Sequence, residues 1–490
     1  MKVCFINPPF KSEYGKFSRE SRSASIGHSG VLYYPLWLIY AAAVVEDHGF
    51  EVVFIDAPAK RLPIDQTLKR VRNEAADAKL FVLDTSTPSI YSDVAFGATV
   101  KSFYPDAKIM LVGTHPTATD EETMSISTAI DFIARREFDY ICLDTARALE
   151  AGSPIIEVKG LTYRDEAGKI QRTPDAPLIE DLDSIPFASK FIKEHLDYKD
   201  YFFPAATYPE IQMFTGRGCM AYCYFCVYPQ TLSGHKYHLR SPENVVKEFK
   251  YIAENFPEIK EVVIEDDSFI SNKEHLTKIC KLLIKTGLNK RLKWLCEARI
   301  TIDLDIMKLM KCAGCRTLIP GIESYDEQML KNIKKGIKKE WIDEYIANTH
   351  KAGLLVHACY MVGNMGETRE TMEKTLEAAL RYKTDTAQFF PLMPYPGTEA
   401  YAWAKSNGYI KGGYEDYLHE DGTQACVINL PELSSKDLVD FCSYARKKYY
   451  LRPWYIAHRL KMGLTDPEDM KRSLKGFWRL KNSLFKKIEK

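Results

Sequence analysis

Three cysteines within eight residues, Cys219, Cys223 and Cys226, constrain this chain more than any other feature. The spacing CxxxCxxC can place three thiolates around one side of an iron–sulfur cube. A 4Fe–4S cluster usually takes four protein ligands, so three would leave one iron open to another molecule. Zinc or three buried thiols are the alternatives. Zinc needs a fourth Cys or His nearby; His235 and His238 are candidates, but no close CxxC pair completes that pattern.

Length and composition describe an ordinary globular chain of two or three domains. The 490 residues are 46% apolar and 27% charged, and the net charge of +1 gives no reason to expect a nucleic-acid partner. No run of eighteen apolar residues predicts a transmembrane helix, and no signal peptide is expected. Twelve cysteines without a secretion signal favour a reducing, cytoplasmic compartment over a disulfide framework.

Apolar runs alternate with helical patterns along residues 1–150. This alternation predicts an α/β domain with a doubly wound, Rossmann-like parallel sheet, followed by a connector at 151–205 with a hairpin at 160–169. The expected strands are 2–7, 51–55, 80–83 and 108–112, and the expected helices are 35–48, 63–78 and 90–104.

Two loops of this domain follow strands, at the edge of the sheet where ligands bind in such folds. Their hydroxyls and backbone amides suit a large amide-bearing or phosphate-bearing ligand, although ordinary turns with helix N-caps have the same composition. No GxGxxG is present, which argues against a dinucleotide. The candidate residues are Thr85, Ser86, Thr87, Gly113, Thr114, His115, Pro116 and Thr117.

A second alternation over 206–410 predicts six strand–helix units, which fit a partial (β/α)6 barrel. Barrel enzymes place their chemistry at the C-terminal ends of strands, and polar residues cluster there. Each group alone is equally compatible with a turn and a helix cap. Strands are expected at 211–214, 261–265, 292–296, 317–321, 355–360 and 386–391, with helices at 241–256, 273–287, 303–312, 325–333, 339–352 and 368–382. The strand-end candidates are Asp266, Asp267, Arg299, Gly321, Glu323, Ser324 and Gly363.

In this order, the cysteine motif and the strand-end motifs resemble the radical S-adenosylmethionine (SAM) enzymes. Gly321-Ile322-Glu323-Ser324 matches that superfamily's Gly-Ile-Glu-Ser, and residues 361–368 resemble its Gly-x-Pro-Gly-Glu-Thr, with Met365 replacing the proline. The resemblance implies that the three cysteines bind a 4Fe–4S cluster. Its open iron would bind SAM, which the cluster cleaves to a 5′-deoxyadenosyl radical. The strand-end candidates would then lie near SAM and the substrate.

Residues 113–117, Gly-Thr-His-Pro-Thr, resemble the Gly-Gly-x-His-Pro-Thr loop of the cobalamin (B12)-binding radical SAM class, which includes the class B type methylases. Stretches 228–235 and 450–453 resemble its cyclase-like and hopanoid-associated branch. The resemblance implies cobalamin bound with its dimethylbenzimidazole tail off the metal. His115 would then lie near the cofactor without binding cobalt, because Asp-x-His-x-x-Gly is absent. Residues 134–139 depart from the Gly-Glu-Gly-Glu-like segment usual in the class.

This resemblance predicts an anaerobic enzyme that methylates an unactivated carbon with methylcobalamin. A radical cyclase, oxidase or rearrangement enzyme is the alternative, and a non-catalytic cobalamin sensor is a more distant one. The substrate, a small molecule, lipid or peptide, should lie between the domains over Asp266, Asp267 and Glu323. The expected electron donor is a flavodoxin or ferredoxin.

The last segment, 411–490, is expected to be mainly helical, to take no part in the barrel and to close one side of the substrate space. Residues 446–490 hold fourteen Lys and Arg against four Asp and Glu. They form either a solvated helical cap or a surface for an acidic protein, a lipid headgroup or phosphate. Cys312 and Cys315 form a CxxC pair, which we interpret as structural because no second pair completes a metal site.

Overall fold

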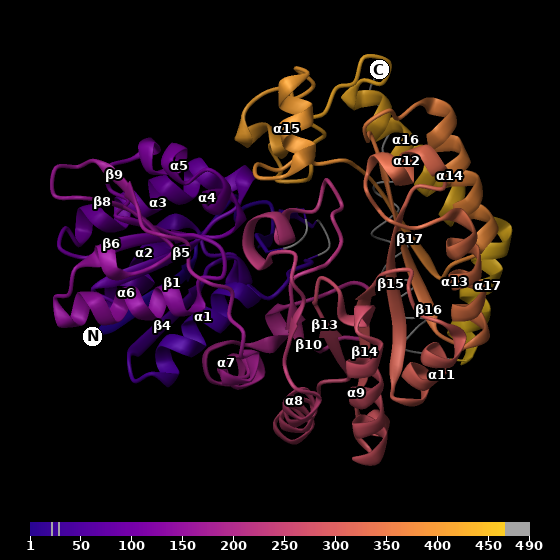
Figure 1. Cartoon of the computed structure of the whole chain (residues 1–490), viewed down its shortest axis with the longest axis horizontal. Helices are drawn as coiled ribbons and strands as arrows, with labels where there is room; N and C mark the ends of the chain where they lie inside the picture. Colours follow the sequence, from indigo (N-terminus) through magenta and orange to yellow (C-terminus); the bar gives the residue numbers. More distant parts are fainter. Residues whose placement is uncertain (21–22, 28–29, 466–490) are drawn as a thin grey trace.

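The computed structural model describes residues 1–20, 23–27 and 30–465. Two large sheets, one in each half of the chain, form the framework of the molecule (Figure 1); the first is mainly parallel and the second is parallel throughout. Within the described residues, no helix is both long enough and apolar enough to cross a membrane.

The N-terminal sheet has seven strands in the order β4-β1-β5-β6-β7-β8-β9. Val3 and Phe5 of β1 belong to one apolar cluster, whereas Cys4 and Ile6 belong to another, so both faces of this strand are buried. Such burial explains the near-continuous apolar runs that predicted a doubly wound parallel sheet. The elements are β1 (Lys2–Asn7), β2 (Phe17–Ser18), β3 (Ser25–Ile26), α1 (Leu36–Asp47), β4 (Glu51–Asp56), α2 (Ile64–Glu74), β5 (Leu80–Asp84), α3 (Ile90–Phe103), β6 (Lys108–Val112), α4 (Thr114–Ala118), α5 (Asp120–Ile126), β7 (Phe132–Ala134) and α6 (Asp139–Ala151).

The hairpin expected at 160–169 extends this sheet. Strand β8 (Leu161–Arg164) pairs antiparallel with β7, and β9 (Ile170–Arg172) pairs with β8. Part of the stretch expected to be a connector therefore continues the N-terminal sheet. Helix α7 (Ala188–His195) then leads toward the second half.

The second sheet has six strands in the order of the chain, and every neighbouring pair is parallel. Each strand overlaps one of the six ranges expected from the sequence. The elements are β10 (Glu210–Met213), β11 (Gly216–Arg217), β12 (His238–Leu239), α8 (Pro242–Asn255), β13 (Glu261–Ile264), α9 (Lys273–Lys285), α10 (Leu288–Arg291), β14 (Lys293–Ala298), α11 (Leu304–Cys312), β15 (Cys315–Glu323), α12 (Glu327–Asn332), α13 (Lys339–Lys351), β16 (Leu355–Val362), α14 (Arg369–Tyr382), β17 (Thr386–Pro391), α15 (Glu399–Ser406), α16 (Ser435–Tyr450) and α17 (Pro453–Thr465).

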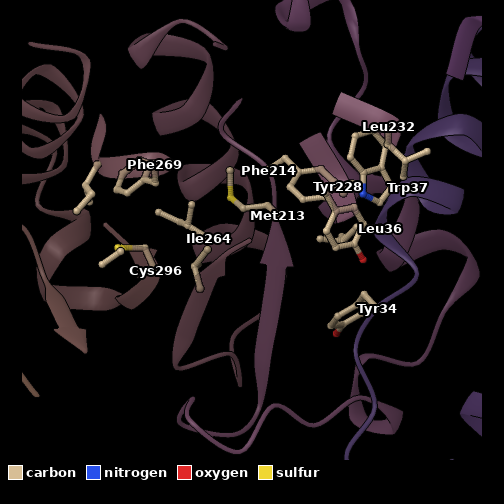
Figure 2. Packing of buried hydrophobic residues seen from close by; sticks show 14 of the residues in the cluster. Tyr34, Leu36, Trp37, Met213, Phe214, Tyr228, Leu232, Ile264, Phe269 and Cys296 are labelled. Atoms are coloured by element: carbon tan, nitrogen blue, oxygen red, sulfur yellow. The ribbon is translucent and has the colours of Figure 1, made fainter. Parts of the chain in front are cut away.

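One apolar core continues from the first half of the chain into the second. Figure 2 shows Trp37 of α1 beside Phe214, which follows β10, and Tyr228 of the cysteine-rich stretch. The ring centroid of Trp37 lies 5.2 Å from that of Phe214 and 6.5 Å from that of Tyr228. Aromatic contacts of this kind add to the stabilisation from apolar burial. The two halves therefore pack as one body at this seam.

Residues after α15 divide between two roles. The segment 413–427 returns over the N-terminal half, where the Tyr414 hydroxyl donates to Glu122 Oε1 at 2.9 Å. By contrast, α16 packs against β17, and the amide of Ala387 donates to the Tyr450 hydroxyl at 3.0 Å. The expectation that 411–490 takes no part in the barrel was therefore wrong for α16, because the outer face of β17 needs an apolar cover. The basic-tail interpretation falls largely on 466–490, outside the described residues.

Candidate functional site

A cavity of about 510 Å³ opens between the two halves of the molecule. Cys219, Cys223 and Cys226 all line it, so the structure brings the three predicted metal ligands to one space. The other walls come from the C-terminal ends of the barrel strands and from the segment between β2 and α1. This is the strand-end position at which barrel enzymes place their chemistry.

The loop that carries the cysteines is held in shape through its main chain. The Cys219 amide donates to the Gly234 carbonyl at 3.2 Å. The side-chain amide of Gln230 donates to the carbonyl oxygens of Cys223 and Cys226, at 3.2 and 2.8 Å. Gly218 has a φ of +86°, and a Cβ there would overlap the carbonyl oxygen of Lys236. The local sequence therefore shapes the loop while the three cysteines line the cavity.

A buried ion pair stands opposite this loop at the end of β15. Glu323 Oε1 lies 2.9 Å from Lys335 Nζ, whereas no described residue bonds to the buried Oε2 atom. Burial disfavours the charge of Lys335, but the Glu323 carboxylate holds its pKa above the ordinary value. Glu323 also has a φ of +65°, which is strained for a residue with a side chain. An unsatisfied buried carboxylate oxygen on a strained backbone marks a position that can bind a polar ligand group.

Asp266 and Asp267 point in different directions. Asp266 accepts hydrogen bonds from the Thr215 amide at 2.6 Å and from the Tyr237 hydroxyl at 3.0 Å, and burial raises its pKa to about 6. It lies behind the cavity and ties the loop after β10 to the end of β13. Asp267 lines the cavity and accepts a hydrogen bond from the Ser233 hydroxyl at 2.8 Å.

The other strand-end candidates divide in the same way. Arg299 and Gly321 line the cavity, and Arg299 Nη1 lies 4.0 Å from Cys223 Sγ. Ser324 instead lies 3.2 Å, oxygen to oxygen, from the hydroxyl of Thr375 on α14, and Gly363 packs near α16. Ser324 and Gly363 therefore support the strand ends from outside the cavity.

The two hydroxyl-rich loops of the N-terminal half meet around a smaller cavity of about 30 Å³. Thr85, Ser86, Thr87, Gly113 and Thr114 line it. Gly113 has a φ of +121°, and a Cβ there would lie 2.5 Å from the Thr85 carbonyl oxygen, so glycine permits the close approach of the loops.

A buried carboxyl group from the end of β5, Asp84, also faces this smaller cavity. Its Oδ2 atom has no hydrogen-bond partner among the described residues, and burial raises its pKa to about 8. Hydroxyls, backbone amides and an unsatisfied carboxyl group can bind one edge of an amide-bearing ligand, most of which would lie outside a cavity of this size.

His115, Pro116 and Thr117 shape these loops without lining either cavity. His115 is 1% exposed, with Nδ1 3.2 Å from the Thr87 hydroxyl oxygen, and burial lowers its pKa to about 3. Thr117 donates from its hydroxyl to the Gly113 carbonyl at 2.8 Å. The role of His115 as a residue near cobalamin stays a prediction.

Several residues of the site were not among the predicted site residues. Glu20, Trp37, Tyr228 and Tyr395 line both cavities, although they come from widely separated parts of the chain. Glu20 comes before α1 in the chain. Its carboxylate accepts hydrogen bonds from the backbone amides of Trp37 and Leu38, at the start of that helix, at 2.8 and 3.0 Å. Burial of this carboxylate raises its pKa well above the ordinary value. Lys335 was not predicted either, although it lies in a lysine-rich stretch, 331–339, that is visible in the sequence.

Comparisons with known proteins place two family models on these halves. The radical SAM superfamily model matches residues 213–379, and the B12 binding domain model matches residues 22–144. A protein named an uncharacterized methyltransferase, from Pyrococcus horikoshii, is 28% identical, over 92% of this chain and 93% of that protein. The anaerobic magnesium-protoporphyrin IX monomethyl ester cyclase of Rubrivivax gelatinosus is 26% identical, over 82% of this chain and 69% of that protein.

A solved structure has the same fold. It is the radical S-adenosylmethionine methyltransferase TsrM from Kitasatospora setae, solved with tryptophan substrate and a SAM analogue. The TM-score is 0.65 at 18% identity, over 91% of this chain and 90% of that one.

Proposed function

We infer that this radical SAM protein with a B12-binding domain is a cobalamin-dependent radical SAM enzyme, and we propose that it methylates an unactivated carbon of a small molecule. One observation carries the proposal. The cavity that holds the three cysteines and the cavity between the hydroxyl-rich loops share five lining residues, including Trp37 and Tyr228. A substrate placed between them would therefore face both cofactor sites at once.

The residues present fit the implied cofactors. Cys219, Cys223 and Cys226 would hold the 4Fe–4S cluster, and the loops at 84–87 and 113–114 would hold cobalamin. When bound, the cluster together with SAM would supply radical chemistry, and cobalamin would supply methyl transfer.

We propose separate roles for two charged side chains of the larger cavity, Glu323 and Arg299. The Glu323 Oε2 atom, unsatisfied within the described chain, is placed to accept from an ammonium or hydroxyl group of SAM. Arg299, beside Cys223, is placed to bind an anionic group. Trp37, Tyr228 and neighbouring apolar groups exclude water from the space between the two cofactor sites, which protects reactive species.

A cyclase or another radical enzyme without net methyl transfer is the second candidate. The Rubrivivax relative, whose name is that of a cyclase, supports it. Both candidates use the same cavity. A non-catalytic cobalamin sensor would need neither the three cysteines nor the strand-end residues around them. A flavodoxin or ferredoxin donor and a cytoplasmic location remain predictions.

The test uses anaerobically reconstituted protein and SAM that carries a trideuterated methyl group. Mass spectrometry should detect substrate that has gained this methyl group. Product formed without the label would instead favour the cyclase class. The triple variant with Cys219, Cys223 and Cys226 replaced by alanine should lose the cluster and all SAM cleavage, whereas Cys312→Ala, at an exposed cysteine on α11, is the matched control. Retained cleavage in the triple variant would refute the cluster assignment.

A further inference from the structure

A buried ion pair joins the two halves immediately before the cysteine loop. Arg217 donates from Nη1 to Asp139 Oδ2 at 2.7 Å and from Nη2 to Asp139 Oδ1 at 2.9 Å. Asp139 is the first residue of α6 in the N-terminal half, and the exposed fractions of the two side chains are 2% and 0%. A bidentate pair between a guanidinium and a carboxylate fixes orientation as well as distance. The pair can therefore hold one half in register with the other.

The same segment of the N-terminal half binds the loop a second time. Glu137 Oε1 lies 2.8 Å from Nε2 of His238 and 3.8 Å from Nη1 of Arg217. Arg217 lies on β11 and His238 on β12, and these two strands pair antiparallel with each other. Their connection, residues 218–237, contains all three cysteines. Asp139 and Glu137 therefore bind the two strands, β11 and β12, from which the cysteine loop extends.

Arg217 also contacts a residue that lines both cavities. The Arg217 guanidinium carbon lies 4.4 Å from the ring centroid of Trp37, which lines both cavities. Burial disfavours the charge of Arg217, but Asp139 holds its pKa above the ordinary value. Arg217 thus remains charged while it packs on an aromatic face, a favourable cation–π arrangement.

These contacts also account for the unusual sequence of 134–139. The acidic residues of this stretch, Glu137 and Asp139, contact the second half, while Arg135 is buried within its own half and pairs with Asp175. The stretch is therefore used for attachment between halves.

We propose that Arg217, through Asp139, is a positioning residue that fixes the cysteine loop relative to the B12-binding domain and thereby sets how often SAM cleavage leads to product. The effect on product rests on the proposed function; the effect on position does not.

Position can be measured by pulsed electron paramagnetic resonance on reconstituted protein. One nitroxide goes on Cys312, the cysteine that is exposed in the described chain, and the other on the thiol that Ser102→Cys introduces at an exposed site on α3. The distance distribution should broaden or shift in Arg217→Gln and in Asp139→Asn. The control Arg135→Gln removes an equally buried arginine that makes no contact between the halves within the described chain, and it should keep the original distribution. An unchanged distribution in Arg217→Gln would overturn the proposal.

The catalytic consequence is measured as product formed per SAM cleaved. We expect about a tenfold fall in Arg217→Gln, equivalent to a tenfold change in one rate constant, and a partial recovery in Arg217→Lys, which keeps the charge but loses the bidentate geometry. If Arg217→Gln does not fold, Arg217→Lys tests the proposal instead. We then expect a smaller change in the distance distribution and in the product formed per SAM cleaved. An unchanged ratio in a variant with a broadened distribution would refute the link to coupling. If wild-type protein forms no product, the proposed function fails while the distance measurement still decides on position.

Discussion

Backbone conformation at Gly218 controls whether the cysteine loop can form. A Cβ at this position would overlap the Lys236 carbonyl oxygen, and φ is +86°. We expect Gly218→Ala to cost about 2 kcal/mol or more, since the left-handed conformation alone costs about 1–2 kcal/mol for a residue with a side chain. Iron content after reconstitution and the free energy of unfolding are the measurements.

Gly287→Ala is the matched control for this substitution. Gly287 also has a positive φ, +73°, but no atom lies within 4 Å of the position that a Cβ would occupy. This variant should lose about 1 kcal/mol of stability and keep its full iron content. Equal iron loss in both variants would show that the crowding at Gly218 is not the cause.

A buried neutral imidazole at His115 predicts a pH dependence of stability. Burial lowers its pKa to about 3 from an ordinary value of 6.5. Between these values the unfolded chain binds a proton that the folded chain does not, so stability rises with pH across this window and is lost as pH falls. The loss should be about 1.4 kcal/mol per pH unit. His115→Asn should remove this part of the slope in urea unfolding between pH 7 and pH 5; parallel slopes would contradict the assignment.

At the scale of residues, the sequence predicted the strand ends at which the cavities lie, but not which side chains there face them. Asp266 and Asp267 are adjacent, and only Asp267 lines the cavity. Alternation about the end of β13 allows one of the two to face inward, and the hydroxyls of Thr215 and Tyr237 select the outward position for Asp266. Those partners come from other segments, which a local pattern cannot reveal.

The turn after the last cysteine stabilises the loop as an element. Residues Pro229–Ser233 form a single π-helical turn, and Gln230 within it donates to the carbonyls of Cys223, Tyr224 and Cys226. Gln230→Glu keeps the shape but places a carboxylate beside these oxygens, so we expect a loss of about 2–4 kcal/mol from unsatisfied carbonyls and repulsion. Iron should then be lost faster to a chelator. Gln328→Glu, at an exposed glutamine whose side-chain amide donates to Asn332 on its own helix, is the control and should retain iron normally; equal loss in both would refute the role of Gln230.

Elements with a clear hydrophobic pattern in the sequence were predictable, and contacts between elements far apart in the sequence were not. All six barrel strands overlap their expected ranges, because each is an apolar run bounded by turn residues. The pairing of β8 with β7 was missed, since the hairpin has no pattern that distinguishes a sheet edge from a free hairpin. Helix α16 lies in the segment 411–490, which was predicted to be mainly helical, yet its packing against β17 was not predicted.

The arrangement of the two halves was beyond local prediction for the same reason. The sequence placed one cofactor site in each half, and the requirement that both reach one substrate predicted a site between them. Among the residues that form the seam, Arg217 and Tyr228 flank the cysteine motif, whereas Trp37 belongs to α1, far away in the sequence. Their contacts arise only when both halves have folded.

At the scale of the whole molecule, the segment 413–427 forms part of the wall of the larger cavity. Gln424 lines the cavity, the Tyr414 hydroxyl bonds to Glu122, and the Tyr417 hydroxyl donates to the Pro394 carbonyl at 2.6 Å. Because α16 supports the barrel, removing all of 411–490 would damage the fold. A finer variant, Tyr414→Phe with Tyr417→Phe, removes only hydrogen bonds of the two hydroxyls, each worth about 1 kcal/mol.

Loosening this wall should admit water and let the substrate shift from its reactive position, so product per SAM cleaved should fall by about tenfold, corresponding to about 1.4 kcal/mol. Substrate-free SAM cleavage should fall much less, because the cysteines and Glu323 lie on other walls of the cavity. Both quantities are measured together by mass spectrometry of 5′-deoxyadenosine and product. Tyr444→Phe, at an exposed tyrosine on α16, is the control. An unchanged ratio in the double variant, with its cluster and fold intact, would show that 413–427 does not confine the substrate.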